Sequence, residues 1–202
     1  PALLELGEPL YGYASDGYWC DIGNPVQYLQ ANHDALQRRL KVKIPGREIN
    51  GVWIDEHAEI EDYVEIKEPA LIGSKTRIRE KASIGPFSII GNGATVDEKA
   101  MIKRSVVWNN TVIGPRADLA GCLVGENCTI KDAAMVLEGA AVGDECIVGR
   151  GATVKSGIRI WPGKMIEAGA TVTMDLKWGM RWMTSLFGNH GITGLANIEI
   201  TP

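Results

Sequence analysis

Residues 70–102 read ALIGSKTRIREKASIGPFSIIGNGATVDEKAMI, and this stretch decides the fold. Within it an aliphatic residue returns at every sixth position, namely at Ile72, Ile78, Ile84, Ile90, Val96 and Ile102. A period of six matches neither the 3.6-residue turn of an α-helix nor the two-residue alternation of a long strand. It predicts a repeat architecture in which each repeat is one short strand followed by a turn.

The same period continues on both sides of this stretch, from Val52 to Thr173. Only two steps are shorter, with five residues from Ile102 to Val107 and from Leu119 to Val124. The residue two before the aliphatic one is Ala, Ser, Thr or Cys at 17 of the 21 positions, which places one bulky and one small side chain on the inner side of each strand. Three hexads form one coil of about 18 residues, so the pattern predicts a parallel β-helix of about seven coils.

The three walls of the predicted solenoid, which we name A, B and C in chain order, each receive one aliphatic residue per coil. Both five-residue steps fall between wall C and wall A, so the register survives them. Wall A takes Ile54, Ile72, Ile90, Val107, Val124, Val142 and Ile160; wall B takes Ile60, Ile78, Val96, Ile113, Ile130, Val148 and Ile166; wall C takes Ile66, Ile84, Ile102, Leu119, Val136, Val154 and Val172.

Glycine follows the inward aliphatic residue in pairs such as Ile72-Gly73, Ile84-Gly85 and Val148-Gly149. With a small residue four positions after the aliphatic one, this pattern resembles the hexapeptide-repeat proteins. The resemblance implies a mainly all-β fold, a left-handed parallel β-helix over residues 49–173. It says little about function, because the fold hosts acyltransferases, nucleotidyltransferase tails and plain scaffolds.

Composition excludes several classes of function. A net charge of −4 gives no electrostatic case for binding nucleic acid or an anionic membrane, and no apolar run approaches 18 residues. Cys122, Cys128 and Cys146 occupy small inward positions of the repeat, where reduced thiols serve as small apolar side chains. We therefore expect a cytoplasmic protein.

Residues 1–48 precede the repeat, and they have the character of the end of another domain. Alternating apolar residues from Leu10 to Ile22 predict one or two short strands. Asn24 and Pro25 are a favourable N-cap and first residue for a helix over 25–40. The face of this helix that carries Val26, Leu29, His33, Leu36 and Leu40 must then dock on the solenoid or on a further domain.

The motif Gly17-Tyr18-Trp19-Cys20-Asp21-Ile22-Gly23, followed by a turn and a helix, is similar to the C-terminal end of sugar-1-phosphate nucleotidyltransferases, in particular the mannose-1-phosphate guanylyltransferase branch. The resemblance implies that Asp21 is a ligand of Mg²⁺ in a parent enzyme that takes a nucleoside triphosphate and a sugar 1-phosphate. The Gly-rich nucleotide-binding loop of that family does not occur in this sequence. We expect no catalytic residue and no such activity in this chain alone.

Outward positions on wall A are apolar in six of seven coils, unlike those of walls B and C. Such a column predicts a covered surface. The predicted interface comprises Trp53, Leu71, Ile89, Val106, Trp108, Leu123, Ala141 and Trp161. Its expected partner is the segment before residue 40, a further domain of the parent, or a second copy in a homo-oligomer.

On wall B, Glu61, Arg79, Asp97 and Lys131 predict a solvated ladder of charges.

Residues 174–185 are predicted to be a linker, and residues 186–202 resemble the opening strand of the phosphoglucomutase/phosphomannomutase family. Asn189, His190 and Thr193 depart from that family, which has a phosphate-binding Arg at the position of Thr193.

The order of the three resemblances favours a parent that makes GDP-mannose, with this chain as a module for oligomerisation or regulation. The alternatives are an ADP- or UDP-sugar pyrophosphorylase, a non-catalytic interaction protein, and a hexapeptide acyltransferase. The acyltransferase would need a His base, and only His57 lies in the repeat.

Overall fold

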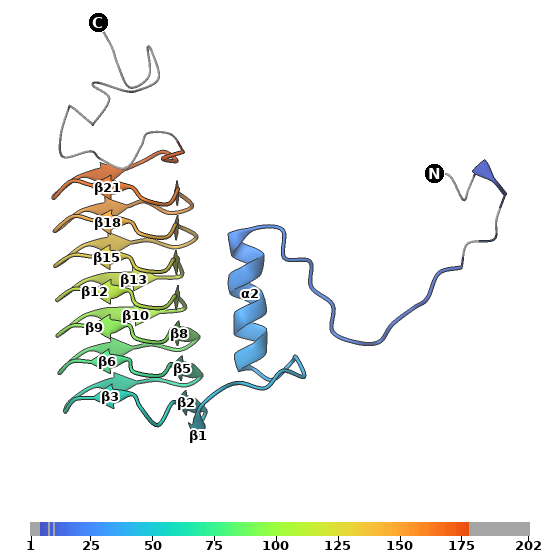
Figure 1. The fold of residues 1–202 in the computed structure, drawn as a ribbon, viewed down its shortest axis with the longest axis horizontal. Helices are drawn as coiled ribbons and strands as arrows, with labels where there is room; N and C mark the ends of the chain where they lie inside the picture. The colour runs from blue at the N-terminus through green and yellow to red at the C-terminus, as the bar shows by residue number, and fades with distance from the viewer. Residues whose placement is uncertain (1–4, 8, 10, 178–202) are drawn as a thin grey trace, which may run out of the picture.

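The structure of the protein, a computed structural model, describes residues 5–7, 9 and 11–177. Figure 1 shows a stack of coils with one helix, α2 (Pro25–Leu36), along its side. The predicted linker beyond Lys177 and the mutase-like stretch lie outside the described residues. Within the described part, no helix has the length and apolar character needed to cross a membrane.

Three sheets form the walls of the solenoid. Wall A contains β1 (Arg47–Ile49), β2 (Val52–Ile54), β5 (Ala70–Ile72), β8 (Ser88–Ile90), β11 (Val106–Val107), β14 (Leu123–Val124), β17 (Ala141–Val142) and β20 (Arg159–Ile160). Wall B contains β3 (Glu59–Ile60), β6 (Arg77–Ile78), β9 (Thr95–Val96), β12 (Val112–Ile113), β15 (Thr129–Ile130), β18 (Ile147–Val148) and β21 (Met165–Ile166). Wall C contains β4 (Glu65–Ile66), β7 (Ser83–Ile84), β10 (Met101–Lys103), β13 (Asp118–Ala120), β16 (Met135–Val136), β19 (Thr153–Val154) and β22 (Thr171–Val172).

The register of these strands confirms the predicted fold, a mainly β structure in which a parallel β-helix of seven coils follows one helix. Ile72 lies opposite Ile90, and Val107 lies opposite both Ile90 and Val124, so the five-residue steps leave wall A in register. From β5 to β20 the inward aliphatic side chains are almost wholly inaccessible to solvent and form one continuous core. Burial of this stack is the main source of stability, because every coil contributes apolar area to it.

One turn geometry, which the sequence pattern did not predict, closes the corners of the coils. The residue three before the inward one has a positive φ at 19 of the 21 positions, of which 11 are not glycine. Lys81 (φ 58°), Asn110 (φ 55°) and Ala133 (φ 53°) are examples. This left-handed residue is retained at Arg104 and Gly121, so the five-residue steps shorten the part of the turn that precedes it. The turn therefore defines the corner, and its length is adjustable.

The glycine after the inward residue has a steric cause. A Cβ atom added at Gly149 would lie 2.6 Å from the backbone nitrogen of Ala168 in the next coil. Such a contact is closer than real Cβ atoms allow, so this position needs a residue without a side chain. The Ile-Gly and Val-Gly pairs of the sequence therefore mark close approach between successive coils.

Polar small residues on the inner side of wall B satisfy backbone carbonyls of the next coil. The Thr76 and Thr111 hydroxyls donate to the carbonyl oxygens of Gly91 and Gly125, each at 2.7 Å. The Cys128 thiol donates to Gly143 O at 3.1 Å, and the Cys146 thiol donates to Trp161 O at 3.2 Å. The thiols thus take the structural place of threonine hydroxyls and remain reduced.

Three boundaries and one expected element differ from the predictions. The sheet begins at Arg47 because β1 pairs antiparallel with β2, and the chain continues the stack to Leu176, which bridges to Ile160. Helix α2 ends at Leu36 rather than at residue 40, because Arg38 has a φ of 60° and breaks the helical path. Residues 11–23 contain no strand, since no neighbouring strand is available to pair with them.

Candidate docking surface on wall A

Helix α2 begins at a well-formed cap. Asn24 has extended backbone, and its side-chain oxygen accepts a hydrogen bond from Gln27 N at 3.0 Å. The Gln27 side chain in turn accepts from Gly23 N at 2.9 Å and from Asn24 Nδ2 at 2.8 Å. Two backbone donors at the start of the helix are thereby satisfied, and Pro25 follows at the first helical position. The cap fixes where the preceding loop enters the helix.

The helix lies beside wall A and crosses several coils (Figure 1). Near its start, the rings of Tyr28 and Trp108 have their centroids 6.1 Å apart. In its middle, the His33 ring lies 5.0 Å from that of Phe87. Just beyond its end, the Arg38 guanidinium lies over the ring of Trp53 at 5.6 Å. The contacts run from the fourth coil down to the first, so α2 lies across the strands of wall A.

Side-chain burial agrees with this contact. Trp53 and Val106 point outward from wall A, yet they are only 7% and 3% exposed. On the helix, Leu29 and Leu36 are buried, and they are seven residues apart, two turns on one face. Val26, which the apolar pattern placed on the same face, is 62% exposed, because the docked face is centred on Leu29, His33 and Leu36. Packing against the solenoid therefore holds the helix in place.

Asp34 connects the helix to the loop before it. Its carboxylate accepts hydrogen bonds from the Tyr18 hydroxyl at 2.8 Å, from Gln30 Nε2 at 3.0 Å and from Arg39 Nη1 at 2.9 Å. The Tyr18 hydrogen bond, with those of Gln30 and Arg39, lowers the pKa of Asp34 although burial opposes the shift. The same bond raises the pKa of Tyr18. The motif that contains Tyr18 is thus anchored on a helix that wall A holds.

A groove of about 540 Å³ lies on wall A from the fourth coil to the seventh, beyond the part that α2 covers. The start of the helix forms one side of the groove through Ile22, Pro25 and Tyr28, and the wall forms the other through Trp108, Leu123, Ala141 and Trp161. Arg159 and Asp144 are charged residues at its border. Trp108 is 40% exposed and Trp161 is 54% exposed, so large aromatic area faces this groove.

The eight residues predicted as an interface fall into three groups. Trp53 and Val106 are buried. Leu71, Ile89, Leu123 and Ala141 are half-buried, and Trp108 and Trp161 are exposed beside the groove. Phe87 also contributes to the docking of α2 through His33, and Asp34 holds the loop before the helix through Tyr18; the sequence pattern identified neither residue. Phe87 occupies a corner position with φ 59°, outside the inward and outward columns, so no periodic signal marks it.

Asp21 is exposed in the loop before α2. Among the described residues, no cluster of three or more His, Cys, Asp or Glu side chains has the geometry to hold a metal ion. Mg²⁺ binds proteins through as few as one or two carboxylates together with substrate phosphates. A Mg²⁺ ion bound here would take one carboxylate from Asp21, and its remaining ligands would have to come from substrate or from further residues.

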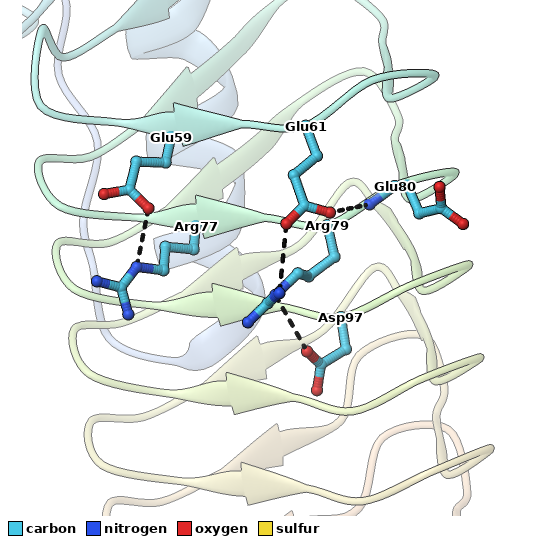
Figure 2. Close-up of polar contacts among 6 residues, drawn as sticks. All are labelled: Glu59, Glu61, Arg77, Arg79, Glu80 and Asp97. Atoms are coloured by element: carbon cyan, nitrogen blue, oxygen red, sulfur yellow. Dashed lines mark hydrogen bonds and ion pairs between the residues drawn. The ribbon is translucent and has the colours of Figure 1, made fainter.

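Three of the four predicted ladder residues, Glu61, Arg79 and Asp97, form ion pairs on the outer face of wall B (Figure 2). Arg77 Nε lies 3.0 Å from Glu59 Oε2, and Arg79 lies 3.3 Å from Glu61 Oε1 and 4.0 Å from Asp97 Oδ1. The Glu59, Arg77, Glu61 and Arg79 side chains are about half exposed or more. Exposed ion pairs of this kind contribute little stability individually, and pairing of each charge with the next coil leaves no concentrated charge for a ligand.

His57 is the only histidine in the repeat, and it lies in the first coil. Its ring Nδ1 is 3.2 Å from Asp55 Oδ1, and its side chain is 62% exposed. A histidine oriented by a carboxylate is a feature of general bases. The described coils follow one another without an inserted loop at this point, so nothing on this side encloses a substrate.

Comparison with known proteins identifies a family and several relatives that share this β-helix. Residues 49–154, more than half of the chain, match the family model described as the EIF2B subunit epsilon LbH domain, where LbH denotes the left-handed β-helix. A UTP–glucose-1-phosphate uridylyltransferase from Synechocystis is 35% identical over 140 residues, 67% of this chain and 36% of that protein. A glucose-1-phosphate adenylyltransferase from Bacillus thuringiensis is 28% identical over 145 residues, with the same two coverages.

The chain spans about a third of the length of these curated relatives, 36% in both cases. Among solved structures, a hexapeptide transferase family protein from Anaplasma phagocytophilum matches with a TM-score of 0.50 and 18% identity, over 58% of this chain and 70% of that one. That similarity supports the fold alone. The chain therefore belongs to the EIF2B subunit epsilon LbH domain family, and it is a hexapeptide-repeat β-helix module related to sugar-1-phosphate nucleotidyltransferases.

Proposed function

We propose that this chain is the β-helix module of a sugar-1-phosphate nucleotidyltransferase, and that the parent enzyme makes GDP-mannose and pyrophosphate from mannose 1-phosphate and GTP. One observation carries the proposal: the motif from Gly17 to Gly23, which resembles the end of such a catalytic domain, leads through a capped turn into a helix docked on a β-helix of this family. The uridylyltransferase and adenylyltransferase relatives named above support the reaction class.

In this proposal the module holds the catalytic domain in a fixed position. Helix α2 is secured to wall A by Tyr28, His33 and Arg38, and the Tyr18–Asp34 hydrogen bond secures the loop before it. That loop presents apolar side chains that nothing in the described chain covers, including Tyr11, Tyr13, Trp19 and Ile22. Several exposed large apolar side chains within one short segment are typical of a surface that another domain covers.

Asp21 is proposed as a metal ligand in the parent enzyme. Its exposed position beside the apolar loop allows it to face a neighbouring catalytic domain. Mg²⁺ bound there would neutralise phosphate charge during attack of the sugar phosphate on the nucleotide α-phosphorus. The part played by this chain is to hold one carboxylate at a fixed distance from the cap of α2, since only Ile22 and Gly23 separate it from Asn24.

A matrix of assays on the protein encoded by the whole gene tests the proposal. Pyrophosphate release is measured with GTP, ATP and UTP, each combined with mannose 1-phosphate and glucose 1-phosphate. The expected result is preference for GTP and mannose 1-phosphate, with no release by residues 1–202 alone. An Asp21→Asn variant should lose activity at least about a hundredfold, because removal of one group that stabilises charge in the transition state commonly costs this much. Asp16→Asn, which changes a nearby exposed carboxylate, is the matched control.

The same matrix decides between the proposal and its rivals. UDP- or ADP-glucose synthesis is the second candidate, because the relatives from Synechocystis and Bacillus thuringiensis are named for the uridylyl and adenylyl reactions. Preference for UTP or ATP with glucose 1-phosphate would establish it and reject the mannose assignment. An inactive whole protein would reject nucleotidyl transfer and leave an interaction role for the solenoid.

A further inference from the structure

The first coil forms the lower end of the stack in Figure 1, and two of its three walls stop there without a cover. On wall A, β1 pairs with β2 and closes that edge. Walls B and C end at β3 and β4, and the described chain adds no strand below either of them. Each of these two strands therefore has one unpaired edge, which is the kind of edge that can bind a further strand.

Backbone carbonyl groups show what the edge of β4 lacks. In the second coil, the Ala82 and Ile84 carbonyl oxygens accept hydrogen bonds from backbone amides of the first coil at 3.1 and 2.8 Å. The equivalent carbonyls of the first coil, those of Val64 and Ile66, have no coil of the described chain beneath them. A strand placed under β4 would supply the missing donors in the same arrangement.

Apolar side chains of the core reach the surface at this end. Ile60 is 38% exposed, whereas Ile78, its neighbour in the second coil, is fully buried. Ile66, the inward residue of β4, is half-buried. Beside it lies a hollow of about 480 Å³ that is lined by Ile49, Asn50, Val52, Ile54, Ile66, Lys67 and Glu68. An end coil of a solenoid needs a cover, because stacking is what buries the inner face of each repeat.

The first coil is also strongly acidic. Residues 52–69 contain seven Asp or Glu residues and one Lys, a net charge of −6, whereas the whole chain carries only −4. Two of these carboxylates pair with arginines of the second coil (Figure 2). Asp62, Glu65 and Glu68, in and around β4, are exposed, and none of them forms an ion pair within the described chain. Lys67 offsets one of the three charges, so the edge of β4 stays negative.

These features select one kind of partner. A second copy placed end to end would bring two acidic coils together, which charge repulsion opposes. A segment that alternates Lys or Arg with Ile or Val fits the backbone, the apolar surface and the charge at once. Successive side chains of a strand point to opposite faces, so its aliphatic residues would cover Ile66 while its basic residues lie beside Glu65.

We propose that the open end of the first coil is a docking site for an extended segment of a partner protein, in which basic and aliphatic residues alternate. The segment pairs with β4 as an additional strand, so that main-chain hydrogen bonds hold it while side chains give selectivity. The site lies at the end of the solenoid, away from the groove on wall A. The inference does not depend on the proposed nucleotidyltransferase reaction.

Binding of labelled peptides to the 202-residue chain, measured by fluorescence anisotropy at low ionic strength, tests the inference. The probe is Lys-Val-Lys-Ile-Lys-Val-Lys with blocked ends. A peptide with Glu in place of Lys should not bind. A peptide with Ser in place of Val and Ile should bind about tenfold more weakly, because it keeps the charges but covers no apolar surface. Methylation of every backbone amide of the probe should abolish binding, since it removes the donors for β4.

Two charge reversals test the place of binding. Glu65→Lys should weaken binding of the probe at least about tenfold, because it puts like charges beside each other across the strand pair. Glu167→Lys, at an exposed glutamate of the last coil, is the matched control and should leave binding unchanged. Asp62→Lys gives the same readout if circular dichroism shows that Glu65→Lys does not fold.

Equal losses in Glu65→Lys and Glu167→Lys would overturn the inference, as would equal binding of the Val/Ile and Ser peptides, because unspecific charge attraction would then explain binding. Binding that survives methylation would exclude strand pairing. If the protein encoded by the whole gene does not bind the probe, another part of the parent covers this end and the inference fails. Self-association that Glu65→Lys abolishes would also overturn it, since a second copy would then be the occupant.

Discussion

The Tyr28 ring meets the Trp108 ring at 49° with a centroid separation of 6.1 Å, and this contact joins the first turns of α2 to the fourth coil of the solenoid. Trp108 also borders the groove, so the same ring serves two surfaces. Because Leu29, His33 and Leu36 dock the rest of the helix, loss of Tyr28 should loosen its beginning without releasing it entirely.

We expect Tyr28→Ala to increase exchange of the α2 amides with solvent deuterium by about 2- to 10-fold, because a tilted aromatic pair contributes about 0.5–1.5 kcal/mol beyond its buried area. Val26→Ala, two residues earlier in the helix, changes a side chain that is 62% exposed and should leave exchange unchanged. Equal effects of the two substitutions would show that the ring contact does not hold the helix.

His33 makes the docking of α2 dependent on pH. Burial is the largest cause of its lowered pKa; nearby Arg104 lowers it further through its charge, while a hydrogen bond to the Arg104 backbone and the charge of Asp34 oppose the shift. The ring Nε2 is buried without a partner. A histidine whose folded pKa lies below its unfolded value of about 6.5 contributes full stability above that value and loses it as the pH falls further.

Hydrogen exchange of the α2 amides at pH 7.5 and 5.5, corrected for intrinsic rates, measures this effect. Protection should fall at pH 5.5 in the parent chain, while Asp34, with its lowered pKa, remains ionised. His33→Phe should abolish the fall, and His57→Gln, which changes an exposed histidine of the first coil, should retain it. A pH response that persists in His33→Phe would assign the effect to another group.

The solenoid was predictable from sequence because its signal is repeated in every coil. Val64 and Lys164 depart from the small inward residue of the pattern, but the regular hexads on either side still define the register. The docking of α2 has no such redundancy. Its apolar pattern placed both Val26 and Leu36 on the docked face, whereas the structure buries Leu36 and leaves Val26 exposed. The helix end depends likewise on one left-handed residue, Arg38, which has no marked preference for that conformation.

The cysteines give a direct test of the core. Burial raises the pKa of Cys122 and Cys128 to about 12 and also raises that of Cys146, so these thiols are both inaccessible and protonated at pH 8. Cys20, in the loop before α2, is only half-buried. Titration with a thiol reagent should detect one reactive thiol in the native chain and all four in denaturant. More than one in the native chain would mean that the coils open readily.

The left-handed corners predict a substitution that stabilises the protein. Ala133 has φ 53° at the corner before β16, and its side chain is exposed. The left-handed conformation costs an L-residue about 1–2 kcal/mol, whereas glycine adopts it freely and loses about 0.5–1 kcal/mol through greater freedom of the unfolded chain. Ala133→Gly should therefore raise the free energy of unfolding by up to about 1 kcal/mol. Ala168→Gly, at an exposed site without a positive φ, should lower the free energy of unfolding by a similar amount. Urea unfolding of both variants measures the difference. A loss of stability in both variants would mean that the corner imposes no strain on alanine.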